Sequence, residues 1–151
     1  MGKDDKKIRH KFSASYIKLC MTEEIKSRFG PPLFKDNHCI YKGDPKDIFH
    51  VVYYGGTTTD IDVEGDIERV KTSELIWIPT AKEIQQEFHI QENDGFWCDY
   101  KNFITDPTDF GYSREELSHF RSEEERWLLY NMKVMCGKKI VENKWIKCKH
   151  Q

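Results

Sequence analysis

Residues 75–83 read Leu75-Ile76-Trp77-Ile78-Pro79-Thr80-Ala81-Lys82-Glu83, and this stretch decides the fold. Four consecutive apolar residues predict a buried strand, and Pro79 ends it because proline has no N–H to give to a sheet. Thr80 and Glu83 form a capping box, in which each side chain accepts a hydrogen bond from a backbone N–H of the other residue. A strand that runs directly into a helix predicts a domain that mixes both.

Strands are expected on both sides of this stretch. Runs of β-branched and aromatic residues predict them at 38–42, 47–54, 57–63 and 67–71, and 96–100 is a further candidate after a turn at Asn93-Asp94-Gly95. An earlier helix is expected to begin at Ser13 or Ser15 and to end before residues 30–32, which are Gly-Pro-Pro.

The later helices are marked by their ends. The helix that follows the stretch extends from residue 81 to about residue 90. Two more capping boxes join Ser113 to Glu116 and Ser122 to Glu125. The second box starts the longest helix, which Gly137 ends.

These elements predict an α+β fold. A mainly antiparallel sheet is expected from about residue 38 to about residue 100, because the element order lacks the alternation of strands and helices found in parallel sheets. The two main helices, which begin near Ser15 and at Glu123, are expected to pack on one face of the sheet. A hairpin that turns at Glu142-Asn143 completes the chain.

Length and charge limit the class of protein. We expect residues 1–12 to be a disordered basic tail and residues 13–151 to be a single domain. The formal net charge of −2 gives no overall attraction to nucleic acid or to an anionic membrane. The basic residues gather at both ends of the chain, as solvated tails or as a docking site for a phosphate-bearing partner.

The cysteines and the apolar runs indicate a compartment. Five cysteines without a C-x-x-C pair fit neither a disulfide framework nor a zinc site. No apolar leader follows the first residues, and no run has the length of a membrane span. We therefore expect a cytoplasmic protein.

No motif indicates catalysis, and we predict no catalytic residue, no cofactor and no metal. The acidic string at 60–66 resembles the start of a calcium loop, but Lys71 stands where that loop requires Glu. His38 could reach His50 across a hairpin only if the strand register allowed it. A hydrolase would be built on Cys98 and His119, and no nucleophile or phosphate-loop motif accompanies them.

Aromatic and basic residues gather between residues 96 and 127. Rings stack on bases and guanidinium groups bind phosphates, so this composition predicts a nucleotide ligand. Alternatively, half of these rings pack in the core and the arginines pair with nearby glutamates. The predicted ligand-binding residues are Phe96, Trp97, Asn102, Phe110, Tyr112, Arg114, Arg121 and Arg126.

Three segments of the chain carry a resemblance to known proteins. They are residues 16–20 (Tyr-Ile-Lys-Leu-Cys), residues 75–80, and the helix around Trp127-Leu128 that runs into Lys144-Trp145. Together they resemble small proteins of phages and prophages of Gram-positive bacteria. Phage proteins of this size include counter-defence proteins, among them the anti-Thoeris sponges that sequester cyclic ADP-ribose-type signals. The resemblance implies a non-catalytic oligomer that encloses a nucleotide.

We therefore predict a phage-encoded protein that counteracts host immunity by sequestering a small cyclic nucleotide, with neither a membrane nor a nucleic acid as its partner. One alternative is an inhibitor of a host defence nuclease, which would use the acidic surface of residues 115–125. Another is a small hydrolase. At least a dimer is expected, joined through the hairpin around Trp145 or the apolar face of the Glu123–Cys136 helix, with Arg121 or Arg126 near the boundary.

Overall fold

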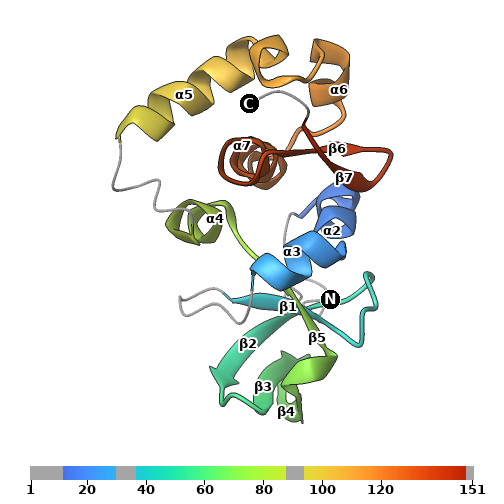
Figure 1. The fold of residues 1–151 in the computed structure, drawn as a ribbon. Helices are drawn as coiled ribbons and strands as arrows, with labels where there is room; N and C mark the ends of the chain where they lie inside the picture. The colour runs from blue at the N-terminus through green and yellow to red at the C-terminus, as the bar shows by residue number, and fades with distance from the viewer. Residues whose placement is uncertain (1–11, 30–36, 88–93, 149–151) are drawn as a thin grey trace, which may run out of the picture.

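The computed structural model describes residues 12–29, 37–87 and 94–148, and it shows an α+β fold (Figure 1). The described strands form one antiparallel five-stranded sheet and a C-terminal antiparallel hairpin, so the predicted fold class is confirmed. Of the predicted tail, only Phe12 is described. The elements are α2 (Ala14–Cys20), α3 (Glu23–Arg28), β1 (His38–Tyr41), β2 (Ile48–Tyr54), β3 (Thr58–Val63), β4 (Asp66–Lys71), η1 (Thr72–Glu74), β5 (Leu75–Ile78), α4 (Ala81–Glu87), α5 (Asp94–Thr105), η3 (Pro107–Phe110), α6 (Arg114–Ser118), α7 (Glu123–Cys136), β6 (Lys138–Val141) and β7 (Lys144–Lys147).

The sheet is curled, and its strand order shows why. The order is β4-β3-β2-β1-β5, so the two edge strands are consecutive in the chain and are joined by the three residues of η1. A flat five-stranded sheet would hold its edges about 19 Å apart, whereas the link from Lys71 to Leu75 spans at most about 14 Å. One face of the curled sheet carries a small core of its own, made of Cys39, Val51, Ile61, Val70, Leu75 and Trp77.

The stretch that decides the fold behaves as predicted. β5 is largely buried and ends at Ile78, before Pro79. The Thr80 N–H donates to Oε1 of Glu83 at 2.8 Å, and the Glu83 N–H donates to Oγ1 of Thr80 at 3.2 Å. This capping box begins α4, and the two other predicted boxes begin α6 and α7.

The helices lie beyond one side of the sheet, with α2 and α4 nearest to it, α7 farther away, and α5 and α6 at the far end (Figure 1). α2 contacts β5, and α7 contacts both α2 and α4. Tyr16 of α2 is fully buried, and its hydroxyl donates to the carbonyl of Pro79 at 2.6 Å. Trp127 and Leu128 of α7 belong to the same core. The first main helix therefore meets the sheet directly, and the second packs over it and over α4.

The predicted strand at 96–100 is wrong, because these residues form the first half of α5. Asp94 and Gly95, which were expected in a turn, belong to the same helix, and Asn93 lies outside the described residues. Tyr100 stacks on Trp127 of α7, with ring centroids 3.6 Å apart. Packing against α7 decides a segment whose aromatic composition favours a strand.

The predicted first helix is divided into α2 and α3 at Met21-Thr22. Ser13, rather than Ser15, caps α2 by accepting a hydrogen bond from the Tyr16 N–H at 3.1 Å. The expected stop at residues 30–32 lies outside the described residues.

The C-terminal part follows the prediction. Gly137 ends α7 with φ of 68°, a left-handed conformation that glycine adopts without steric cost. β6 and β7 are joined by the two-residue turn Glu142-Asn143, whose φ values of 50° and 66° are typical of a type I′ hairpin turn.

Candidate functional site

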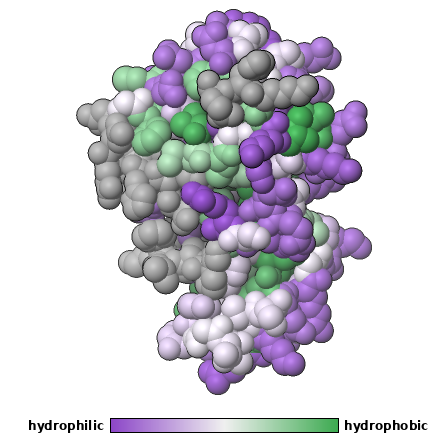
Figure 2. Space-filling view, viewed as in Figure 1, coloured by the Kyte–Doolittle hydropathy of each residue, from purple (hydrophilic) through white to green (hydrophobic). Residues whose placement is uncertain are grey.

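The predicted ligand residues lie between the start of α5 and the first turn of α7. α5 and α6 are at the end of the molecule opposite the sheet (Figure 1). Hydrophilic residues gather on this end of the surface (Figure 2). Residues 94–126 contain nine aspartates and glutamates but only four lysines and arginines, so this part of the chain is acidic.

Two of the predicted rings lie on the first turns of α5. Trp97 is 38% exposed and meets Trp127 edge to face, with ring centroids 4.9 Å apart. Phe96 is half-buried and packs against the main core. Trp97 therefore offers a ring to a ligand, whereas Phe96 contributes mainly to packing.

The other two predicted rings, Phe110 and Tyr112, differ in burial. Phe110 is half-buried and meets Phe103 edge to face, with ring centroids 5.3 Å apart. Tyr112 is 1% exposed, so its ring is not available to stack on a ligand in this structure. Burial raises the pKa of the Tyr112 hydroxyl well above its ordinary value.

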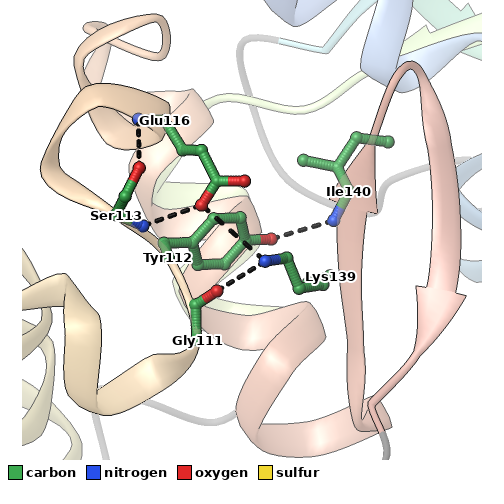
Figure 3. A network of polar contacts seen from close by, with 6 residues as sticks. All are labelled: Gly111, Tyr112, Ser113, Glu116, Lys139 and Ile140. Atoms are coloured by element: carbon green, nitrogen blue, oxygen red, sulfur yellow. Dashed lines mark hydrogen bonds and ion pairs between the residues drawn. The ribbon is translucent and has the colours of Figure 1, made fainter.

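Tyr112 belongs to a network that joins the C-terminal hairpin to α6 (Figure 3). Its hydroxyl accepts a hydrogen bond from the Ile140 N–H at 2.9 Å. Nζ of Lys139 donates to the Gly111 carbonyl, and it lies 3.7 Å from Oε1 of Glu116 and 4.9 Å from the centroid of the Tyr112 ring. These contacts hold the hairpin in place, which is a structural role.

The three predicted arginines have separate surroundings. Arg114 is exposed on the first turn of α6. Nε of Arg121 donates to the Ser118 carbonyl at 3.4 Å. Arg126 is half-buried, and its Nε donates to the Phe120 carbonyl at 2.8 Å. Two of the three guanidinium groups are thus held by backbone carbonyls of different residues.

An open cleft of about 460 Å³ lies along α5 and η3. Its lining residues are Asp99, Asn102, Thr105, Asp106, Asp109 and Phe110. Asn102 and Phe110 belong to the predicted set, but the three aspartates do not. Positions 99 and 102 are three residues apart on α5, so their side chains lie on one face of the helix. The prediction of a strand at 96–100 did not place these two side chains together.

The carboxylates of the cleft have defined surroundings. Oδ2 of Asp99 accepts a hydrogen bond from the Tyr130 hydroxyl at 2.9 Å. The Thr108 hydroxyl donates to Asp106 at 2.5 Å, and this hydrogen bond, together with the charge of Arg114, lowers the pKa of the Asp106 carboxyl. An acidic cleft with an aromatic ring in its wall suits a guanidinium or ammonium group and repels a phosphate.

The other candidate groups of the sequence lie apart in the described residues. Cys98 and His119 are both exposed, and no hydrogen bond joins them. Residues 60–66 form β3, a tight turn and the start of β4, and Oδ1 of Asp62 accepts from the Gly65 N–H at 2.8 Å. Within residues 12–29, 37–87 and 94–148, no three His, Cys, Asp or Glu side chains are grouped to hold a metal.

Comparisons with protein-family models, curated proteins and solved structures gave no match. Among the helices of the described residues, none combines the length and the apolar character needed to cross a membrane.

Proposed function

We propose that the chain is a non-catalytic binding protein whose acidic end receives a positively charged segment of a partner protein. The observation that carries the proposal is the open cleft, with its three aspartates and the ring of Phe110. A lysine or arginine side chain would meet opposite charge from the carboxylates and a cation–π contact from the ring.

Such a protein would counteract host immunity by covering the basic surface of a defence nuclease. Nucleases hold DNA through lysines and arginines that neutralise phosphates, and an acidic protein surface competes for the same residues. The sequence placed an inhibitor of this kind on the acidic residues 115–125, whereas the cleft is lined by residues 99–110 and Glu125 is buried. The counter-defence setting is the one that the phage resemblance implies.

The test is inhibition of DNA cleavage by a panel of purified defence nucleases, at increasing concentrations of the protein and of salt. We expect inhibition of a susceptible nuclease to weaken as salt rises, because the contact is between charges. The variant Asp99→Asn/Asp106→Asn/Asp109→Asn should weaken inhibition by more than about tenfold.

A matched control removes the same charge from another part of the surface. Asp47, Asp66 and Glu68 are exposed residues of the sheet region, so the variant Asp47→Asn/Asp66→Asn/Glu68→Gln should inhibit like the wild type. Equal losses in both variants would show that only net charge matters, and wild-type protein that inhibits no nuclease would contradict the proposal.

Sequestration of a small cyclic nucleotide is the second candidate, and the exposed ring of Trp97 favours it. Burial and the charge of Glu123 raise the pKa of Tyr100, and the charge of Arg126 opposes this rise, so Arg126 lies near the same group of rings. A base would stack on Trp97 while Arg126 met a phosphate.

This candidate is tested by incubating the protein with a panel of cyclic nucleotides, removing free ligand, and heating the protein to release what it bound. Intact nucleotide would support sequestration, a cleaved nucleotide would support the hydrolase alternative, and an empty protein would contradict both. Trp97→Ala should abolish retention, whereas Tyr53→Ala, which removes a 64%-exposed ring from the sheet, should not.

A further inference from the structure

The strand register brings two histidines together on the sheet. His38 of β1 lies directly opposite His50 of β2, with ring centroids 5.5 Å apart and ring planes inclined at 66°. The Val51 N–H donates to the Asn37 carbonyl at 3.0 Å, so Asn37 and Val51 form a hydrogen-bonded pair of the ladder. The adjacent pair, His38 and His50, is therefore non-hydrogen-bonded, the kind in which opposite side chains approach most closely.

The separation of the two rings fits a shared metal ion. An imidazole nitrogen binds Zn²⁺ at about 2.1 Å, and the ring centre lies roughly 1.1 Å behind that nitrogen, so each centroid would be roughly 3.2 Å from the metal. At a tetrahedral angle, two such rings have centroids about 5.2 Å apart. The observed separation of 5.5 Å is close to this value.

One histidine of the pair is buried and the other is exposed. His38 is 6% exposed, and the ring of Phe12 meets it edge to face with centroids 5.6 Å apart. His50 is exposed. One imidazole is therefore held by packing, and the other can turn toward an ion that arrives from solvent.

A carboxylate stands on the other side of His50. Asp62 of β3 is directly opposite His50, so the three residues Asp62, His50 and His38 form one row across β3, β2 and β1. Histidines that bind metals commonly donate their second ring N–H to a carboxylate, which fixes the tautomer and strengthens the ligand. Asp62 is placed to act as such a positioning residue.

We propose that His38 and His50 form a binding site for a divalent transition metal such as Zn²⁺, Co²⁺ or Ni²⁺. Imidazole suits these ions, and water would complete the coordination. The site is on the sheet, away from the acidic cleft, so it is independent of the proposed function. A metal bound there would link β1 to β2 and keep open positions for a further ligand.

The experiment is titration of the metal-free full-length protein with Co²⁺ by absorption spectroscopy and with Zn²⁺ by calorimetry. We expect one equivalent of metal and a Co²⁺ spectrum without thiolate charge-transfer bands. His50→Asn, which alters an exposed side chain, should weaken binding by more than about tenfold. Asp62→Asn should weaken it less and should shift the tautomer of His50 seen by NMR. His119→Asn removes an exposed histidine of another surface and should bind like the wild type.

Three outcomes would overturn the proposal: no binding at millimolar metal, wild-type affinity in His50→Asn, or thiolate bands with Co²⁺. His38 is buried, so binding by His38→Gln is interpreted only if the circular dichroism of this variant matches that of the wild type. If it does not match, His50→Asn is the deciding variant. Paramagnetic broadening by bound Co²⁺ should centre on the NMR signals of β1 and β2, and broadening centred elsewhere would also refute the site.

Discussion

Replacing Tyr112 with phenylalanine tests how the C-terminal hairpin is held on the core. The Tyr112 hydroxyl accepts the hydrogen bond of the Ile140 N–H at 2.9 Å. In a hairpin with a two-residue turn, the pair next to the turn, here Val141 and Lys144, is hydrogen-bonded. The adjacent pair, Ile140 and Trp145, is therefore non-hydrogen-bonded, and the Ile140 N–H points away from β7. Tyr112→Phe keeps the ring but leaves the buried Ile140 N–H without its acceptor.

The expected magnitude follows from that one group. A buried donor without a partner costs about 1–3 kcal/mol. In a domain of this size each kcal/mol lowers Tm by roughly 2–4 °C, so Tyr112→Phe should lower Tm by roughly 2–12 °C. The assay is urea unfolding monitored by circular dichroism. The urea concentration at the midpoint should fall, while the slope of the unfolding free energy against urea concentration should stay unchanged.

Tyr130→Phe is the matched control. The Tyr130 hydroxyl donates to Asp99 at the open cleft, where water can replace the lost donor, so the change should cost less than about 1 kcal/mol. The reasoning is refuted if Tyr112→Phe unfolds at the wild-type midpoint or loses no more stability than Tyr130→Phe.

Four further predictions concern the fold and the assembly. Gly137→Ala should destabilise the protein by about 1–2 kcal/mol in urea unfolding, because φ of 68° is unfavourable for residues with a Cβ, and an unchanged midpoint would contradict this. Ser113→Ala should cost about 1 kcal/mol, and Ser122→Ala should cost more because Glu125, its partner in the capping box, is buried; equal losses would count against the role of burial. Burial raises the pKa of the Cys39 thiol to about 12 and also raises that of four tyrosines. In the unfolded chain these thiols and phenols ionise at lower pH than in the folded protein, from about pH 8.5 and about pH 10. The stability that they contribute should therefore be fully present below about pH 8.5 and should fall as the pH rises above that value. A urea midpoint that stays constant to about pH 11 would contradict this. Light scattering should give a multiple of the 18.0 kDa chain mass, and a monomer at all micromolar concentrations would refute the expected oligomer.

The ends of most helices and strands were predictable because they depend on chemistry within four residues of the chain. Pro79 cannot extend β5 whatever surrounds it, and Thr80 and Glu83 satisfy each other's backbone donors without help from another element. The same holds for Gly137, whose left-handed conformation ends α7. Local rules of this kind were sufficient to identify the α+β class.

Local rules failed to predict secondary structure and burial where these depend on packing against an element distant in sequence. Residues 96–100 favour a strand by composition, yet the contact of Tyr100 with Trp127 makes them a helix, and this helix places Asp99 beside Asn102 in the lining of the cleft. The burial of Tyr112 likewise depends on β6, which is distant in sequence.

Strand register shows the same limit most clearly. A shift of one residue between β1 and β2 would turn every side chain of one strand to the opposite face. The sequence shows His38 and His50 as separate residues of two strands, and the folded sheet sets them face to face. Register depends on how the whole sheet packs against the helices, and no short segment contains that information.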